Sequence, residues 1–163
     1  MTQDATTVQI GSSERAFRMI LLTGFLAGTL DITAAIINAS IQHGSTATIV
    51  FQYIASGVFG KEAFESPSMV SWGIIFHYTI AYSWTLLFFF VYPKLSILSK
   101  NRVMVGLVYG LLIWLAMNFV VLPMSNVRRG TPDAFQIALG ISFIMFLVGL
   151  PISLLVNKHY SGK

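Results

Sequence analysis

The stretch MILLTGFLAGTLDITAAIINASI, residues 19–41, is long enough and apolar enough to cross a lipid bilayer. It carries one ionisable residue, Asp31, close to its middle. A charged carboxylate at that depth costs roughly 2.5–3.5 kcal/mol on the insertion scale, so it is expected to face protein or trapped water and to have a partner. The rest of the chain therefore has to supply both further spans and a partner for Asp31.

The composition of the chain is that of a membrane protein whose first partner is the lipid bilayer. Of its 163 residues, 55% are hydrophobic and 10% are charged, whereas soluble domains contain about 25% charged residues. The net charge is +4, but the cations lie at the ends of apolar segments and form no patch interleaved with aromatics, which argues against nucleic-acid binding. The chain has no cysteine, so disulfides, thiolate catalysis and cysteine-based metal sites are excluded.

The hydropathy pattern predicts an all-α fold, a four-span transmembrane helical bundle. We expect a disordered N-terminal tail at 1–15, a membrane bundle at 16–157 and a C-terminal tail at 158–163. The expected spans are residues 19–41, 69–92, 103–122 and 134–156.

A further apolar segment, at about residues 45–60, is too short to be a fifth span. A helix of about fifteen residues rises only about 22 Å, against a hydrocarbon core about 30 Å thick. We therefore predict a short interfacial or re-entrant helix between the first and second spans. Ser45 or Thr46 is the expected N-cap, and Gly57 or Gly60 the expected end.

Positively charged residues predict the orientation of the chain. Four spans place both termini on one side of the membrane, and cytoplasmic loops are enriched in lysine and arginine. Seven cations fall on the side of the termini: Arg15, Arg18, Lys94, Lys100, Arg102, Lys158 and Lys163. Three fall on the other side: Lys61, Arg128 and Arg129. This distribution predicts that both termini are cytoplasmic and that the short helix lies on the outer face.

Small residues recur on one face of two of the spans. Gly24 and Gly28 share a helix face with Asp31, and Gly106 and Gly110 repeat the same four-residue spacing in the third span. This spacing permits close approach between membrane helices. Two interpretations remain open, namely packing inside one bundle and packing against another chain, either in a homo-oligomer or in a larger membrane complex.

Polar residues in the outer halves of the spans predict a pocket. Counted from the outer ends at 1.5 Å per residue, Asp31 lies about 15 Å deep, His77 about 12 Å and Asn118 about 6 Å. Neighbouring helices could bring these groups together in a pocket that opens outward, with the short helix as a lid. The predicted binding-pocket residues are Asp31, His77, Asn118, Asn38 and Gln52, with Gln136 nearer the mouth.

Three uses of this pocket remain open. The polar groups are structural if they only hydrogen-bond across helices, whereas a protonatable Asp31–His77 pair is suited to proton-linked transport. An enzymatic Ser56–His77–Asp31 relay can also be drawn, although the chain contains no G-x-S-x-G, H-E-x-x-H or P-loop motif and we assign no catalytic residue. One buried histidine and one aspartate fall short of a zinc site, and neither a metal nor another cofactor is predicted.

Several sequence words carry a family resemblance over roughly residues 24–156. They are AGTLDITAAI (27–36), QYIASGVFGKEAF (52–64), FHYTIAYSW (76–84) and LPMSN (122–126). With this set the chain resembles small bacterial inner-membrane proteins of unknown function and, more loosely, inner-membrane proteins of the YagU type. The resemblance implies a helical bundle in the bacterial inner membrane, and it implies no catalytic residues.

The sequence therefore favours a non-enzymatic membrane protein. We expect a small transporter-like or proton-linked component that uses Asp31 and His77. The alternatives are a structural or accessory subunit that packs through its glycine faces and, third, a membrane enzyme acting on lipid.

Overall fold

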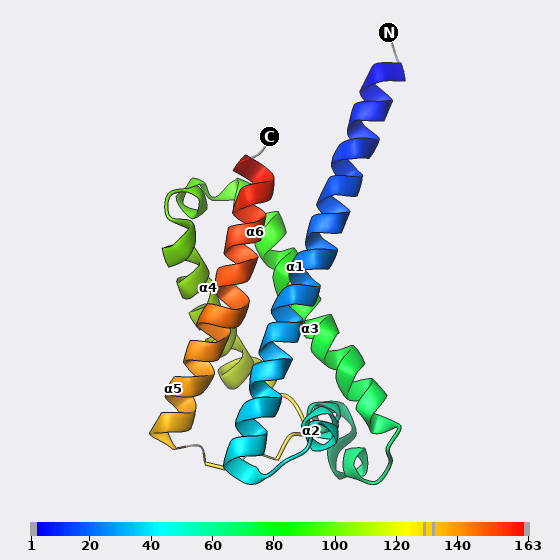
Figure 1. The fold of residues 1–163 in the computed structure, drawn as a ribbon, viewed down its shortest axis with the longest axis vertical. Helices are drawn as coiled ribbons and strands as arrows, with labels where there is room; N and C mark the ends of the chain where they lie inside the picture. The colour runs from blue at the N-terminus through cyan, green and yellow to red at the C-terminus, as the bar shows by residue number, and fades with distance from the viewer. Residues whose placement is uncertain (1–2, 129, 132, 162–163) are drawn as a thin grey trace.

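The chain folds into a bundle of long helices with one short helix between the first two long ones (Figure 1). The computed structural model describes residues 3–128, 130–131 and 133–161, with side chains from residue 13 onward. Pro132, and the cations Arg129 and Lys163 that were counted in predicting the orientation, thus lie outside the described residues. The principal helices are α1 (Gln3–His43), α2 (Ala47–Phe59), α3 (Met69–Val91), α4 (Arg102–Ala116), α5 (Ala134–Phe143) and α6 (Leu150–Ser161). Two π-helical stretches, η4 (Met117–Val121) and η5 (Ile144–Gly149), continue α4 and join α5 to α6. Three 3₁₀ turns, η1 (Gly60–Phe64), η2 (Tyr92–Lys94) and η3 (Ser96–Ser99), lie between α2 and α4.

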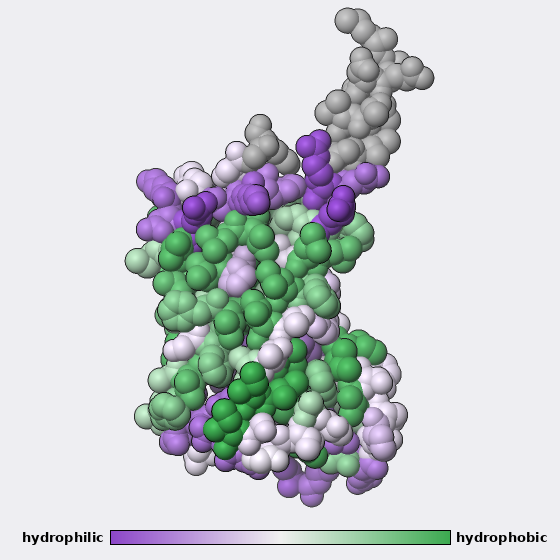
Figure 2. All heavy atoms as spheres, viewed as in Figure 1, coloured by the Kyte–Doolittle hydropathy of each residue, from purple (hydrophilic) through white to green (hydrophobic). Residues whose placement is uncertain are grey.

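Within the described residues, four helical segments are long and apolar enough to cross a membrane: Ser13–His43, Met69–Lys94, Arg102–Val121 and Ala134–Ser161. Figure 2 shows the matching surface, a broad hydrophobic band between two hydrophilic ends. Both termini lie at the same end, which we call the terminal face (Figure 1). The predicted all-α, four-span bundle is confirmed, and the chain is a multi-pass integral membrane protein.

The first helix extends well beyond its membrane span. α1 begins at Gln3, so it includes residues that the sequence analysis assigned to a disordered tail, and Figure 1 shows it projecting past the other helices. The physical reason is that lengthening an existing helix requires no new nucleation, which is the costly step of helix formation.

The helix ends follow local capping chemistry. The Thr46 hydroxyl accepts a hydrogen bond from the Ile49 amide and starts α2, while Gly60, with a φ of 61°, ends it. These are the N-cap and the end that the sequence predicted. Asp133 likewise caps α5, its carboxylate accepting from the Gln136 amide at 2.8 Å.

Each π-helical stretch ends two residues before a proline. η4 ends at Val121, before Pro123, and η5 ends at Gly149, before Pro151. A proline inside a helix lacks an amide donor, and its ring collides with the carbonyl four residues earlier, so the preceding turn has to widen. The distortion that Pro151 imposes on the last span thus takes the form of a π-helical stretch.

The hydrophobic core lies mainly in the half of the bundle nearer the terminal face. Its fully buried members come from α1, the end of α3, α4, and the η5–α6 segment: Ala27, Phe88, Phe89, Tyr92, Ile113, Val148, Ile152 and Val156. α4 crosses η5 very closely, since a Cβ on Gly149 would collide with the backbone of Gly106 and Gly110.

The short helix α2 lies at the end opposite the termini, where Figure 1 shows it nearly end-on beside the longer helices. It packs against α3 at Gly73, where any Cβ would collide with the backbone of Phe51. It is also tied to the segment after η4, because the Asn126 amide donates to Gly57 O at 3.0 Å and Asn126 Nδ2 donates to Val58 O at 2.9 Å. These two attachments hold α2 at the end of the bundle opposite the terminal face.

Candidate functional site

Three hydrogen bonds join α1 to α3 inside the membrane. The Tyr82 hydroxyl donates to Leu21 O at 3.2 Å, and the Tyr78 and Thr29 hydroxyls lie 2.9 Å apart. His77 provides the third bond, between its Nε2 and Gly28 O at 2.8 Å. Because lipid offers no competing partners, these bonds fix the rotation of α3 against α1.

The His77 bond determines which ring nitrogen carries a proton. A carbonyl oxygen can only accept, so the Nε2 of His77 must be the donor. Nδ1 is then the nitrogen at which the ring gains or loses its second proton. His77 is 8% exposed, so most of the ring lies within the bundle.

Asp31 lies one turn beyond Gly28 on α1, on the side of the helix that faces His77. Its carboxyl group interacts electrostatically with the His77 ring, although no hydrogen bond joins the two among the described contacts. The side chain is half-buried. The structure therefore brings the ionisable groups of the first two spans within range of electrostatic interaction across the α1–α3 seam, and we call them the Asp31–His77 pair.

Three other predicted pocket residues form hydrogen bonds with groups other than this pair. Asn38 Nδ2, two turns further along α1, donates to Gln136 Oε1 at 3.2 Å and so joins α1 to α5. Gln52 is 6% exposed and donates to Ser66 O at 3.3 Å. Asn118 Nδ2 donates to Trp114 O at 2.9 Å, within its own helix.

The four glycines predicted at helix contacts all face helices of the same chain. A Cβ on Gly24 would collide with the Tyr82 ring, and one on Gly28 would lie 3.1 Å from both Tyr78 and Ala81. On the other side of the bundle, a Cβ on Gly106 would lie 2.8 Å from Leu150 Cα, and one on Gly110 would lie 2.5 Å from Met145 Cα.

Sequence reasoning missed the tyrosines of the α1–α3 seam. Tyr78 and Tyr82 follow His77 in α3, and their hydroxyls bond to α1. The spacing of these tyrosines indicates a position close to the α1–α3 contact, because Tyr78 and Tyr82 are four residues apart and directly follow His77 and Ala81, which are buried. Hydroxyls this far inside a membrane helix need a partner.

A cavity of about 150 Å³ opens next to α2, at the end of the molecule opposite the terminal face. It is lined by Tyr53, Ser56, Gly60, Lys61, Phe64, Asn126 and Arg128, and the predicted pocket residues are not among them. The Ser56 hydroxyl donates to Tyr53 O at 2.7 Å, and His77 donates to Gly28 O. The Ser56 proton is therefore given to Tyr53 O and not to His77, as the Ser56–His77–Asp31 relay would require. Among the described residues, no cluster of three or more potential metal ligands is found.

Comparison of the chain with protein-family models, with curated proteins and with solved structures gave no significant match.

Proposed function

We propose that this protein is a small proton-linked, transporter-like component of the membrane in which the Asp31–His77 pair binds and releases a proton. The observation that carries the proposal is that His77 bonds to Gly28 O, one turn before Asp31 on α1, and interacts electrostatically with the Asp31 carboxyl across the α1–α3 seam. Ionisable residues this deep in a membrane are costly to retain without a use.

The geometry supports a defined division of labour. His77 Nε2 stays protonated because it donates to Gly28 O, which leaves Nδ1 and the Asp31 carboxyl to exchange the mobile proton. The Asn38–Gln136 bond marks a polar route from the outer end toward the pair. α2, held by Gly73 and Asn126, covers that end and serves as the lid of the route.

Titration of the pair tests the proposal without knowledge of a transported solute. The pH dependence of the Asp31 carboxyl band is followed by infrared spectroscopy in nanodiscs, in wild type and in His77→Gln. We expect the band to respond to pH differently in the two proteins, because groups that interact electrostatically titrate together. An identical response in both proteins would contradict the proposal.

Two matched variants separate this coupling from a general loss of charge. Asp133→Asn removes a carboxylate at a membrane boundary and keeps a good N-cap, and His43→Gln removes an imidazole from the end of α1. Both are expected to leave the titration of the pair unchanged. In liposomes with an internal pH dye, proton flux is expected to fall in Asp31→Asn and in His77→Gln but not in these controls.

The alternative readings have less support. An accessory subunit would use its glycines to contact another chain, but Gly24, Gly28, Gly106 and Gly110 contact helices of their own chain. A lipid-acting enzyme would need Ser56 to bond to His77, and Ser56 bonds to Tyr53 O instead.

We further propose the inner membrane as the location, with the terminal face in the cytoplasm. The excess of cations on the side of the termini supports this orientation.

A further inference from the structure

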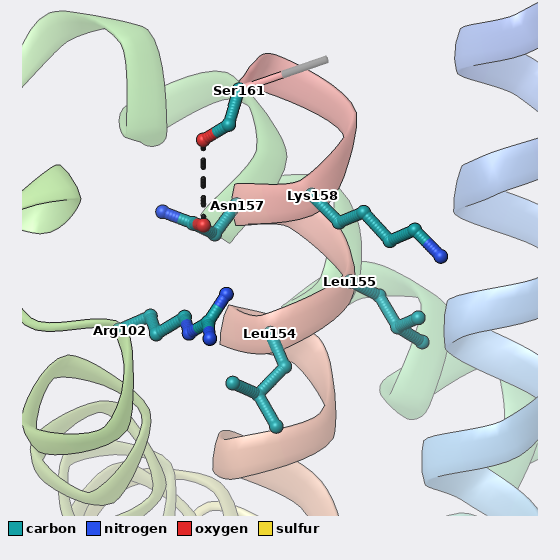
Figure 3. A pocket seen from close by; sticks show the side chains of 6 residues that line it. All are labelled: Arg102, Leu154, Leu155, Asn157, Lys158 and Ser161. Carbon is teal, nitrogen blue, oxygen red and sulfur yellow. Dashed lines mark hydrogen bonds between the residues drawn. The ribbon is translucent and has the colours of Figure 1, made fainter.

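A second cavity, of about 520 Å³, lies at the terminal face between the start of α4 and the end of α6. It is lined by Arg102, Leu154, Leu155, Asn157, Lys158 and Ser161 (Figure 3). Figure 3 shows Arg102 and Lys158 on opposite sides of α6, while the two leucines lie further from the C-terminus, toward the membrane band. The cavity thus has a polar, cationic end at the membrane boundary and an apolar end within the membrane.

Hydrogen bonds hold the polar end of this cavity in place. The Ser153 hydroxyl donates to Arg102 O at 2.8 Å, which fixes the first residue of α4 against α6. Asn157 is 7% exposed, and its Nδ2 donates to the Tyr92 hydroxyl at 2.6 Å. The Ser161 hydroxyl donates to Asn157 Oδ1 at 3.4 Å. The polar lining is therefore tied to both α3 and α4.

The charge of the lining selects an anion. Arg102 and Lys158 are exposed cations, and no acidic residue lines the cavity. An arginine pairs with phosphate oxygens through two parallel hydrogen bonds, and a lysine contributes a point charge. Leu154 and Leu155 lie further from the C-terminus of α6, where they can pack against the first carbons of acyl chains.

From this arrangement we infer that the cavity binds the phosphate headgroup of an anionic phospholipid in the leaflet at the terminal face. Arg102 contacts the phosphate beside α6, Lys158 adds an attractive charge from the other side of that helix, and the acyl chains run over Leu154 and Leu155. Basic pockets between membrane helices are known to hold anionic headgroups in this way. The inference is independent of the Asp31–His77 pair, which lies in the other half of the bundle.

Lipid titration followed by native mass spectrometry of the full-length protein in detergent tests this site. Phosphatidylglycerol is the anionic probe and phosphatidylcholine the zwitterionic one. Since each cation near the surface contributes about 1 kcal/mol, R102Q/K158Q is expected to bind phosphatidylglycerol about 30-fold more weakly than wild type. The matched control R18Q/K94Q also removes one arginine and one lysine from the side of the termini but lies outside the cavity, and its affinity should stay within about 3-fold.

Two further variants keep the test decisive if R102Q/K158Q does not fold. R102K/K158R keeps the charges and should keep most of the affinity, while K158E, at an exposed position, should lose at least about tenfold relative to K94E. The inference would be overturned by equal loss of affinity in site and control variants, by unchanged binding in the site variants, or by equally tight binding of phosphatidylcholine by wild type. Displacement of the lipid by inorganic phosphate, but not by chloride at equal ionic strength, would overturn it in favour of a soluble phosphate ligand.

Discussion

His77 of α3 donates a hydrogen bond from Nε2 to the backbone carbonyl oxygen of Gly28 in α1, over 2.8 Å. Close approach of the two helices is possible because residue 28 has no side chain; a Cβ there would lie 3.1 Å from both Tyr78 and Ala81. Gly28 thus has two roles, since it admits α3 and supplies the acceptor for His77. The same contact joins His77 to a carbonyl one turn before Asp31 on α1.

Replacing His77 should separate the structural role of this bond from its proton chemistry. His77→Gln keeps an N–H donor for Gly28 O and should retain most of the stability, while His77→Leu loses the bond and should cost about 0.6–1.7 kcal/mol, the range of polar bonds between membrane helices. Unfolding in mixed detergent micelles measures the difference. Equal stability of both variants would show that the bond contributes nothing to packing.

A methyl group at Gly73 should detach α2 from α3. Gly73→Ala places a Cβ against the Phe51 backbone, which cannot rotate away as a side chain can, so we expect a destabilisation of about 1–3 kcal/mol and faster proteolysis near α2. Gly57→Ala is the matched control, because its Cβ would lie 3.7 Å from Val127 and 3.8 Å from Ser125, at ordinary contact distance. Similar proteolysis of the two variants would contradict the close approach.

Replacing asparagine by aspartate should be destabilising at one position and tolerated at another. Asn126 Nδ2 donates to Val58 O at the C-terminal end of α2, so Asn126→Asp removes the donor and places a negative charge beside carbonyl oxygens. We expect a loss of about 1 kcal/mol and faster hydrogen exchange in α2. Asn101→Asp should be tolerated, since Asn101 Oδ1 accepts from the Met104 amide as the N-cap of α4, where a carboxylate is favourable. Faster exchange at α4 than at α2 would reverse this assignment.

Because the chain has no cysteine, single cysteines report its orientation directly. Ser96→Cys lies in the turn between α3 and α4, on the terminal face, and Gln42→Cys lies at the opposite end of α1. Both positions are exposed. In intact spheroplasts a membrane-impermeant maleimide is expected to label Gln42→Cys and to label Ser96→Cys only after lysis. The reverse pattern would place the termini outside.

The sequence by itself determined the spans, the short helix and its caps. Hydropathy and length suffice for a membrane helix, because the bilayer imposes a fixed thickness and requires every backbone group to be bonded within the helix. Thr46 and Gly60 were recognisable as the ends of α2 because capping depends on only a few neighbouring residues. Asp31 stood out as a functional candidate because its cost in the membrane follows from its depth alone.

Only the tertiary structure decided which polar groups meet. Depth along the span puts Asp31, His77 and Asn118 in one half of the membrane, but it leaves the rotation and neighbours of each helix undetermined. The Gly24 and Gly28 face turned α1 toward α3, so His77 met Gly28 and Asp31, whereas Asn118 donates to Trp114 O within its own helix. The bonds from the tyrosine hydroxyls of α3 to α1, and the joining of Arg102 to α6 through Ser153, depend in the same way on contacts between distant segments, which local sequence does not encode.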